Sequence, residues 1–168
     1  ADIAADPVDI YLKNGTADSV VIKLDDFAFR AATPYVDVPA GDSLAVIVAA
    51  PSSTGEGDQV IATIPLGALA ANETYVAIAN GVVNTESYAA NPDGRSTAFQ
   101  ILVKAGAREA ATSSDVDFFV LHGATDAPTV DVIARGVATV VQDAAYTDIT
   151  GYITVPAGSY TLEVSVVD

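Results

Sequence analysis

The sequence contains no cysteine and no tryptophan, and its single histidine is His122. The lack of cysteine excludes disulfide frameworks, thiol nucleophiles, iron–sulfur clusters and Cys-type zinc sites. Any imidazole chemistry would depend on His122, with Ser113, Ser114 and Asp126 as its neighbours in the sequence. No Gly-x-Ser-x-Gly pattern places a nucleophile beside it. The sequence therefore predicts that the protein is not an enzyme.

Basic residues are also scarce, with 7 Lys and Arg against 22 Asp and Glu, for a net charge of -15. Such a field repels phosphate backbones, so we expect no nucleic-acid partner. The acids are mostly Asp, which indicates a saline environment that screens the self-repulsion, or simply many Asp-containing turns. No apolar run approaches the roughly 18 to 20 residues that span a bilayer, so we expect no membrane insertion.

What the sequence does contain is a series of short stretches rich in Val, Ile and Tyr, separated by Gly, Pro, Asn and Asp. This pattern is typical of short strands joined by turns, and helical periodicity is nearly absent. It predicts an all-β fold, an antiparallel immunoglobulin-like β-sandwich. The predicted strands are Val8–Leu12, Val20–Leu24, Tyr35–Val38, Leu44–Ala49, Gln59–Ile64, Thr74–Ala79, Thr97–Val103, Val116–Leu121, Val130–Ile133, Ala138–Val141, Tyr152–Val155 and Tyr160–Val166.

The chain also contains an internal repeat. The segment Tyr35–Gly41 (YVDVPAG) returns 117 residues later as Tyr152–Gly158 (YITVPAG). Further landmarks recur in the same order: Val8-Asp9 returns as Val130-Asp131, and Asp26 and Phe29 return as Asp143 and Tyr146. We therefore expect one module at residues 1–112 and the first half of a second at residues 113–168.

The two copies contain different parts of the repeated module. The second copy begins with the predicted strand Val116–Leu121, which has no counterpart in the first, and it stops before counterparts of Pro51 onward. Half a sandwich exposes an apolar face and is not expected to be stable alone. Three arrangements follow: residues 113–168 complete the first module, a neighbouring chain completes each half through Val116, Phe118 and Val120, or the sequence is part of a longer repeat protein. The expected partners are therefore neighbouring repeats or further copies of the chain.

The run Leu121–Val132 (LHGATDAPTVDV), followed by Gly151–Val164 (GYITVPAGSYTLEV), resembles the domain-of-unknown-function 4397 family. That family has a strand, a His-x-Ser-Pro-Asp-Ala-Pro-like loop, a Val-Asp-Val strand and a Val-Pro-Ala-Gly-x-Tyr hairpin; here Ala124-Thr125 replaces Ser-Pro. The resemblance implies a secreted or surface-attached prokaryotic repeat module with an immunoglobulin-like sandwich and no established catalytic residues. The motif residues are His122, Asp126, Pro128, Asp131, Tyr152, Pro156, Gly158 and Tyr160, with Tyr35, Pro39 and Gly41 in the first copy.

Physically, these motif residues are interpreted as scaffold. Tyr152 and Tyr160 flank a Pro-Ala-Gly turn, where a ring packs inward while its hydroxyl reaches a backbone group. Asp126 and Asp131 bracket Pro128, where a carboxylate accepts bonds from backbone N–H groups of the loop. The sequence thus favours a non-enzymatic extracellular structural module, which acts as a repeat of a cell-surface protein or as a self-assembling, strand-complemented filament subunit.

An adhesion module that binds calcium or glycan through loops at one end of the sandwich is the alternative. Asp115 and Asp117 are the favoured calcium ligands, and Asp25-Asp26 and the group Asp2, Asp6 and Asp9 are others, although no loop has EF-hand spacing. Glycan binding is weakly signalled, because tryptophan is absent and most Tyr and Phe alternate with apolar residues.

Overall fold

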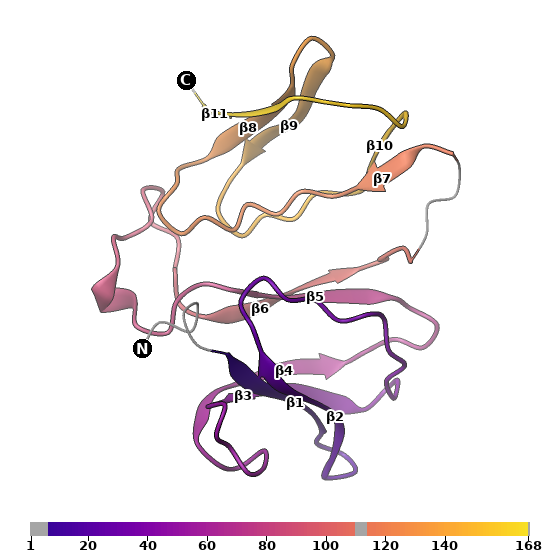
Figure 1. Ribbon diagram of the computed structural model, residues 1–168, viewed down its shortest axis with the longest axis vertical. Helices are drawn as coiled ribbons and strands as arrows, with labels where there is room; N and C mark the ends of the chain where they lie inside the picture. The colour runs from indigo at the N-terminus through magenta and orange to yellow at the C-terminus, as the bar shows by residue number, and fades with distance from the viewer. Residues whose placement is uncertain (1–6, 110–113, 168) are drawn as a thin grey trace. The chain divides into compact units, whose positions relative to one another are not determined.

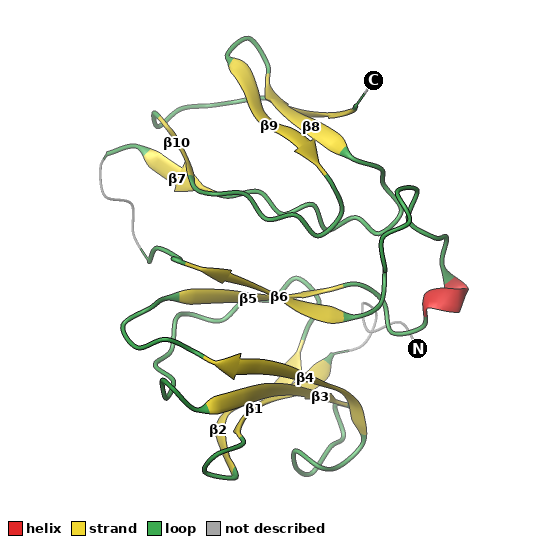
Figure 2. Cartoon of the chain, turned by 180° about the vertical axis from the view of Figure 1, so that it is seen from behind, coloured by secondary structure: helices red, strands yellow, loops and turns green. Residues whose placement is uncertain are grey.

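The structure is a computed structural model that describes residues 7–109 and 114–167. The described residues form antiparallel sheets and no α-helix, with one short 3-10 turn at Thr85–Ser87 (Figure 1). Figure 2 shows that strands and connecting loops make up the rest. The predicted all-β antiparallel class is therefore confirmed.

The chain forms two compact units that divide between Tyr75 and Val76. The predicted boundary between the modules, at residues 112 and 113, lies outside the described residues. Side chains of residues 80–108 bind backbone of residues 123–150: Asn80 Nδ2 donates to the Gly123 carbonyl at 3.2 Å, and Lys104 Nζ donates to the Thr150 carbonyl at 2.9 Å. Residues 76–109 thus pack with the second copy.

The first unit contains one four-stranded sheet in the order β2-β1-β3-β4. Its strands are β1 (Val8–Asn14), β2 (Ser19–Phe27), β3 (Ser43–Ala49) and β4 (Val60–Ala68). The alternation of apolar residues along β1 and β3 places Tyr11, Ile47 and Ala49 together in a buried cluster. Leu44, Val46 and Val48 are buried on the opposite face of β3, so this central strand is buried on both faces.

The second unit contains three smaller sheets with the orders β5-β6, β10-β7 and β11-β8-β9. A buried cluster of Val130, Val132, Val141 and Ala144 packs against Val120, Val140 and Ile153. Val120, just after β7, and Ile153 of β10 thus cover one face of the β11-β8-β9 sheet. The strands are β5 (Tyr75–Asn80), β6 (Gln100–Ala105), β7 (Val116–Phe118), β8 (Val130–Ala134), β9 (Ala138–Ala144), β10 (Ile153–Val155) and β11 (Leu162–Val166).

Eleven of the twelve predicted strands are present among the described residues. The exception is Tyr35–Val38, which forms no strand although its repeat counterpart is β10. β10 is a strand because β7 pairs with it, Val116 opposite Val155 and Phe118 opposite Ile153. No described strand pairs with Val36–Val38, the counterpart of β10.

Candidate functional site around His122

His122 lies where an antiparallel pairing that starts at β7 and β10 ends. Beyond the strands, the Thr150 N–H donates to the Val120 carbonyl at 2.9 Å, and the His122 N–H donates to the Asp148 carbonyl at 3.1 Å. The Thr147 N–H returns a bond to the His122 carbonyl at 2.8 Å. The backbone of residues 116–122 is therefore held along most of its length.

The imidazole of His122 is buried and closes the loop that follows it. Its Nε2 lies 3.0 Å from the Pro128 carbonyl, and because a carbonyl only accepts, Nε2 carries the proton and donates. The ring meets Tyr146 edge to face, with the centroids 6.3 Å apart. Of its neighbours in the sequence, Ser113 lies outside the described residues, and neither Ser114 nor Asp126 hydrogen-bonds to the imidazole. His122 therefore stabilises the loop between itself and Pro128.

A second segment, the turn at residues 91–95, fixes the same loop from outside. Asn91 is buried, and its Nδ2 donates to the carbonyls of Thr125 and Ala127, each at 3.1 Å. Asp93 Oδ2 accepts from both the N–H and the hydroxyl of Thr129, at 2.7 and 2.8 Å. The sequence predicts a turn at Asn91–Gly94, but nothing in it indicates this long-range partner.

Arg95 extends this anchor to the residues that pair with His122. Its guanidinium donates to the Tyr146 carbonyl at 2.7 Å and to Asp148 Oδ1 at 2.8 Å. The other oxygen of Asp148 accepts the Ala145 N–H at 3.0 Å. Neither Arg95 nor Asp148 lies in a recognisable motif, so the sequence does not indicate this contact.

The site also contains a polar atom without a hydrogen-bond partner. The hydroxyl of Tyr146 is fully buried and has no hydrogen-bond partner among the described residues, and burial raises the pKa of this phenol. Asn80 Oδ1 is likewise buried without a partner.

Asp131, by contrast, plays a role that recurs in the first copy. Its Oδ1 accepts the Asp143 N–H at 2.8 Å, as Asp9 Oδ1 accepts the Asp26 N–H at 3.0 Å. Asp126 does not accept the predicted loop bonds: it is exposed and hydrogen-bonds to no described residue. The Thr129 N–H in that loop is bound by Asp93 instead.

The two motif tyrosines both bond to backbone. Tyr160 donates its hydroxyl to the Pro156 carbonyl at 2.7 Å, across the turn that contains Gly158. The Tyr152 hydroxyl accepts the Arg108 N–H at 2.9 Å, while the Arg108 guanidinium lies 4.6 Å from the centre of the Tyr152 ring. In the first copy, Tyr35 and Pro39 are exposed, and the Gly41 N–H donates to the Leu69 carbonyl at 2.8 Å with φ at 78°.

The predicted calcium ligand Asp117 is occupied by protein groups. One carboxylate oxygen accepts the Thr154 hydroxyl, and the other binds Arg108 Nη1 at 2.6 Å. The hydrogen bond from Thr154, and to a lesser degree the one from Arg108, holds the pKa of Asp117 below its usual value. The described residues contain no group of three or more His, Cys, Asp or Glu side chains placed to hold a metal ion. Asp115 and Asp117 therefore gain no support as a calcium site, and Asp2 and Asp6 lie outside the described residues.

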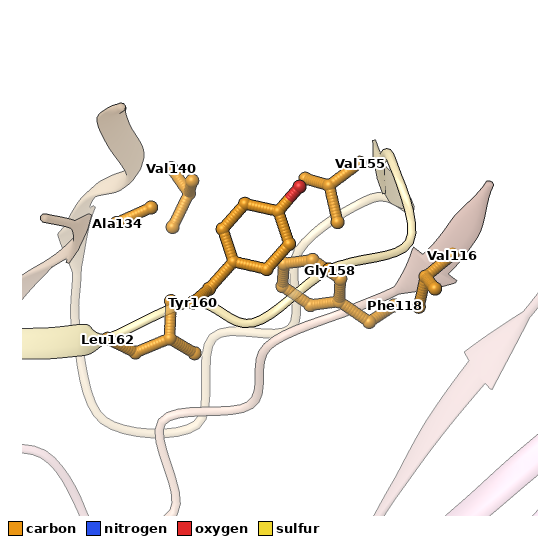
Figure 3. Close-up of a pocket in the computed structure, with 8 residues that line it drawn as sticks. All are labelled: Val116, Phe118, Ala134, Val140, Val155, Gly158, Tyr160 and Leu162. Carbon is orange, nitrogen blue, oxygen red and sulfur yellow. The ribbon is translucent and has the colours of Figure 1, made fainter. Parts of the chain in front are cut away.

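The predicted assembly residues are engaged within the second unit. Val116 and Phe118 belong to β7, which pairs with β10, and Val120 packs on the buried cluster of β8 and β9. A cavity of about 160 Å³ lies beside them. Figure 3 shows its lining, which is apolar except for the Tyr160 hydroxyl: Val116, Phe118, Ala134, Val140, Val155, Gly158, Tyr160 and Leu162.

Comparison with known proteins bears on the second copy. Residues 116–168 match the family model of a domain of unknown function, DUF4397. The resemblance identified from the His122 loop and the Tyr152–Tyr160 hairpin is thus confirmed, and the first copy lies outside the matched range. No curated protein and no solved structure matches the chain. In the part of the chain that the structure describes, no helix has the length and apolar character needed to cross a membrane.

Proposed function

We propose that this chain is a non-enzymatic structural module of an extracellular or cell-surface prokaryotic protein, built of β-sandwich repeats that contact neighbouring repeats. One observation carries the proposal. The same carboxylate-to-backbone bond, Asp9 to Asp26 and Asp131 to Asp143, forms in both copies of the repeat. The two copies therefore share a contact that stabilises the backbone, as expected for a repeated structural unit.

The His122 site is consistent with this role. Its polar groups bond to one another: His122 to Pro128, and Asn91 and Asp93 to the loop between them. A catalytic site needs a nucleophile, a base and an oxyanion donor directed at one vacant point. Here the donors and acceptors are consumed in fixing a loop, which favours a scaffold over a catalyst.

The adhesion alternative has no comparable observation in its favour. Asp117 is bound by Arg108 and Thr154. The cavity beside β7 presents one hydroxyl, and Tyr160 already donates it to Pro156. A sugar site needs several polar groups that converge on the ligand together with an aromatic platform. We therefore keep the structural role as the proposal.

The test of location is antibody labelling of intact and permeabilised cells of the source organism, with a cytoplasmic protein as the control. A structural surface module gives equal labelling in both samples, while the control is labelled only after permeabilisation. Labelling confined to permeabilised cells would refute the proposal. Light scattering after size exclusion, at high protein and high salt concentration, then separates a monomeric repeat from a self-associating subunit.

A further inference from the structure

The turn at residues 28–31 of the first copy, which leads into the segment Ala31–Val38, has the backbone conformation of its counterpart at residues 145–148. Arg30 has φ at 65° and its counterpart Thr147 at 76°. The Ala31 N–H donates to the Ala28 carbonyl at 3.0 Å, and in the second copy the Asp148 N–H donates to the Ala145 carbonyl at 2.9 Å. Two independent features of the backbone thus agree over this turn.

The two segments differ in what covers them. In the second copy, residues 116–122 pair with residues 147–155, and Tyr146 is 0 % exposed beside His122. In the first copy no described strand pairs with Val36–Val38, and Phe29, the counterpart of Tyr146, is 62 % exposed. Val36, the counterpart of Ile153, which packs against the buried cluster of the second unit, is 55 % exposed. An apolar surface that one copy buries under a strand is therefore open in the described part of the other.

We propose that Ala31–Val38 is an acceptor for an antiparallel strand supplied by a neighbouring repeat module, with apolar side chains covering Phe29 and Val36. Main-chain hydrogen bonds provide the affinity in this mode of recognition, and the side chains opposite the acceptor provide the specificity. The inference rests on the proposed function, because it names the contact that a neighbouring repeat would make.

Charge specifies which strand fits. Asp37 occupies the position of Thr154, and Thr154 lies opposite Asp117 and donates its hydroxyl to that carboxylate. A second copy of β7 would place its Asp117 directly opposite Asp37, and like charges in directly opposed positions destabilise a pair of strands. The strand that fits therefore carries Lys or Arg opposite Asp37, which distinguishes a neighbouring module from a second copy of this chain.

The experiment supplies the strand in the same chain. A copy of residues 114–122 is fused directly before Ala1, so that residues 1–7 take the place of residues 123–129, a loop of the same length. The fused copy is either unchanged or carries Asp117→Lys, and each form is combined with the natural Asp37 and with Asp37→Lys. A fused copy with Phe118→Ser and Val120→Ser is the matched control. Amide hydrogen exchange of residues 31–38 is the measurement, and exchange at residues 147–150 reports that the second unit stays folded.

With the natural Asp37, the fused copy carrying Asp117→Lys is expected to slow exchange at residues 31–38 by about tenfold or more relative to the unfused chain. The unchanged copy is expected to slow exchange at residues 31–38 less than the copy carrying Asp117→Lys. When Asp37→Lys is present, the unchanged copy is expected to slow exchange more. No slowing with any fused copy would overturn the acceptor, and so would equal slowing by the serine control. Stronger protection by the unchanged copy at the natural Asp37 would make a second copy of this chain the occupant and overturn the proposal. None of these results depends on where the protein is located in the cell, so this inference and the proposed function can fail separately.

Discussion

Asp131 and Asp143 are joined across β8 and β9 by a bond from the Asp143 N–H to Asp131 Oδ1, at the point where the ladder shifts register between Val130 and Val132. The first copy has the same shift between Val8 and Ile10. In both copies the bulged residue has positive φ, 51° at Asp26 and 52° at Asp143. A β-bulge leaves a backbone group without its ladder partner, and a carboxylate on the facing strand satisfies it. Both copies of the repeat therefore contain the β-bulge and the carboxylate that binds its free backbone N–H.

Removal of the two capping carboxylates is expected to have unequal effects. Asp9 is buried and also accepts the Ser53 hydroxyl at 2.6 Å, so Asp9→Ala leaves two donors unsatisfied and lowers the free energy of unfolding by about 3 kcal/mol. Asp131 is half-buried with one such bond, and Asp131→Ala costs about 1 kcal/mol. Urea denaturation measures the loss of unfolding free energy in each variant, and amide hydrogen exchange shows which unit is destabilised. Exposed Asp126→Ala is the control, and equal losses at all three sites would contradict the assignment.

The same carboxylate makes stability depend on acid. The Ser53 hydroxyl, and next the Asp26 N–H, hold the pKa of Asp9 below its usual value near 3.8. A pKa lowered by folding adds stability that is complete above the unfolded-state value and is lost as the pH falls through the folded-state value. The difference in unfolding free energy between the natural chain and Asp9→Asn should therefore shrink below about pH 4. Comparing two chains of nearly equal charge cancels the general effect of acid on a net charge of -15. A gap that stays constant down to pH 2 would refute this cause.

Strand positions could be predicted from the sequence because period-two alternation and turn residues are local signals. Val8–Leu12 and Leu44–Ala49, for example, lie within β1 and β3. The failure at Tyr35–Val38 has a physical reason, since a strand exists only where a partner supplies its hydrogen bonds, and sequence pattern carries no information on that.

The candidate site was only partly predictable for a related reason. His122, Asp131, Tyr152 and Tyr160 lie in a recognisable motif, and each of them makes an intramolecular contact. Asn91, Asp93, Arg95 and Arg108 were not identified, because their partners lie between 9 and 53 residues away along the chain. Long-range hydrogen bonds of side chains leave no periodic pattern in a single sequence.

Tyr146→Phe is expected to stabilise the second unit. The hydroxyl that it removes is buried without a partner, and such a group costs its full desolvation energy. The expected gain in the free energy of unfolding is up to about 1 kcal/mol at neutral pH. Phe29 occupies the same repeat position in the first copy, so the ring alone is compatible with this backbone.

The stability gained by Tyr146→Phe should be larger at alkaline pH. Burial raises the pKa of Tyr146 above its usual value near 10.0, so the folded state retains a proton that the unfolded state releases. Stability of the natural chain therefore falls as the pH rises above about 10, and the Phe variant escapes this loss. Thermal unfolding at pH 7 and pH 10.5 measures both effects, and a destabilised Phe variant would show that the hydroxyl is bonded.

His122→Ala is expected to lower the free energy of unfolding of the second unit by about 2 kcal/mol, because it leaves the Pro128 carbonyl unbonded and uncovers the Tyr146 ring. His122→Gln keeps an N–H donor at a similar reach and should lose less. Amide exchange at residues 147–150 is the measurement, with faster exchange expected in the order natural chain, Gln, Ala. An unchanged exchange rate in the Ala variant would show that the imidazole does not hold this loop.

Calcium and simple salt should act differently on the natural chain. Because Arg108 and Thr154 occupy the carboxylate of Asp117, millimolar calcium is expected to raise the melting temperature no more than magnesium at equal ionic strength. Sodium chloride should raise it, because about 1 M salt shortens the screening length to roughly 3 Å and weakens repulsion within a chain of net charge -15. A calcium-specific rise that Asp117→Asn abolishes would return the metal site to consideration, since a ligand that binds the native state must stabilise it.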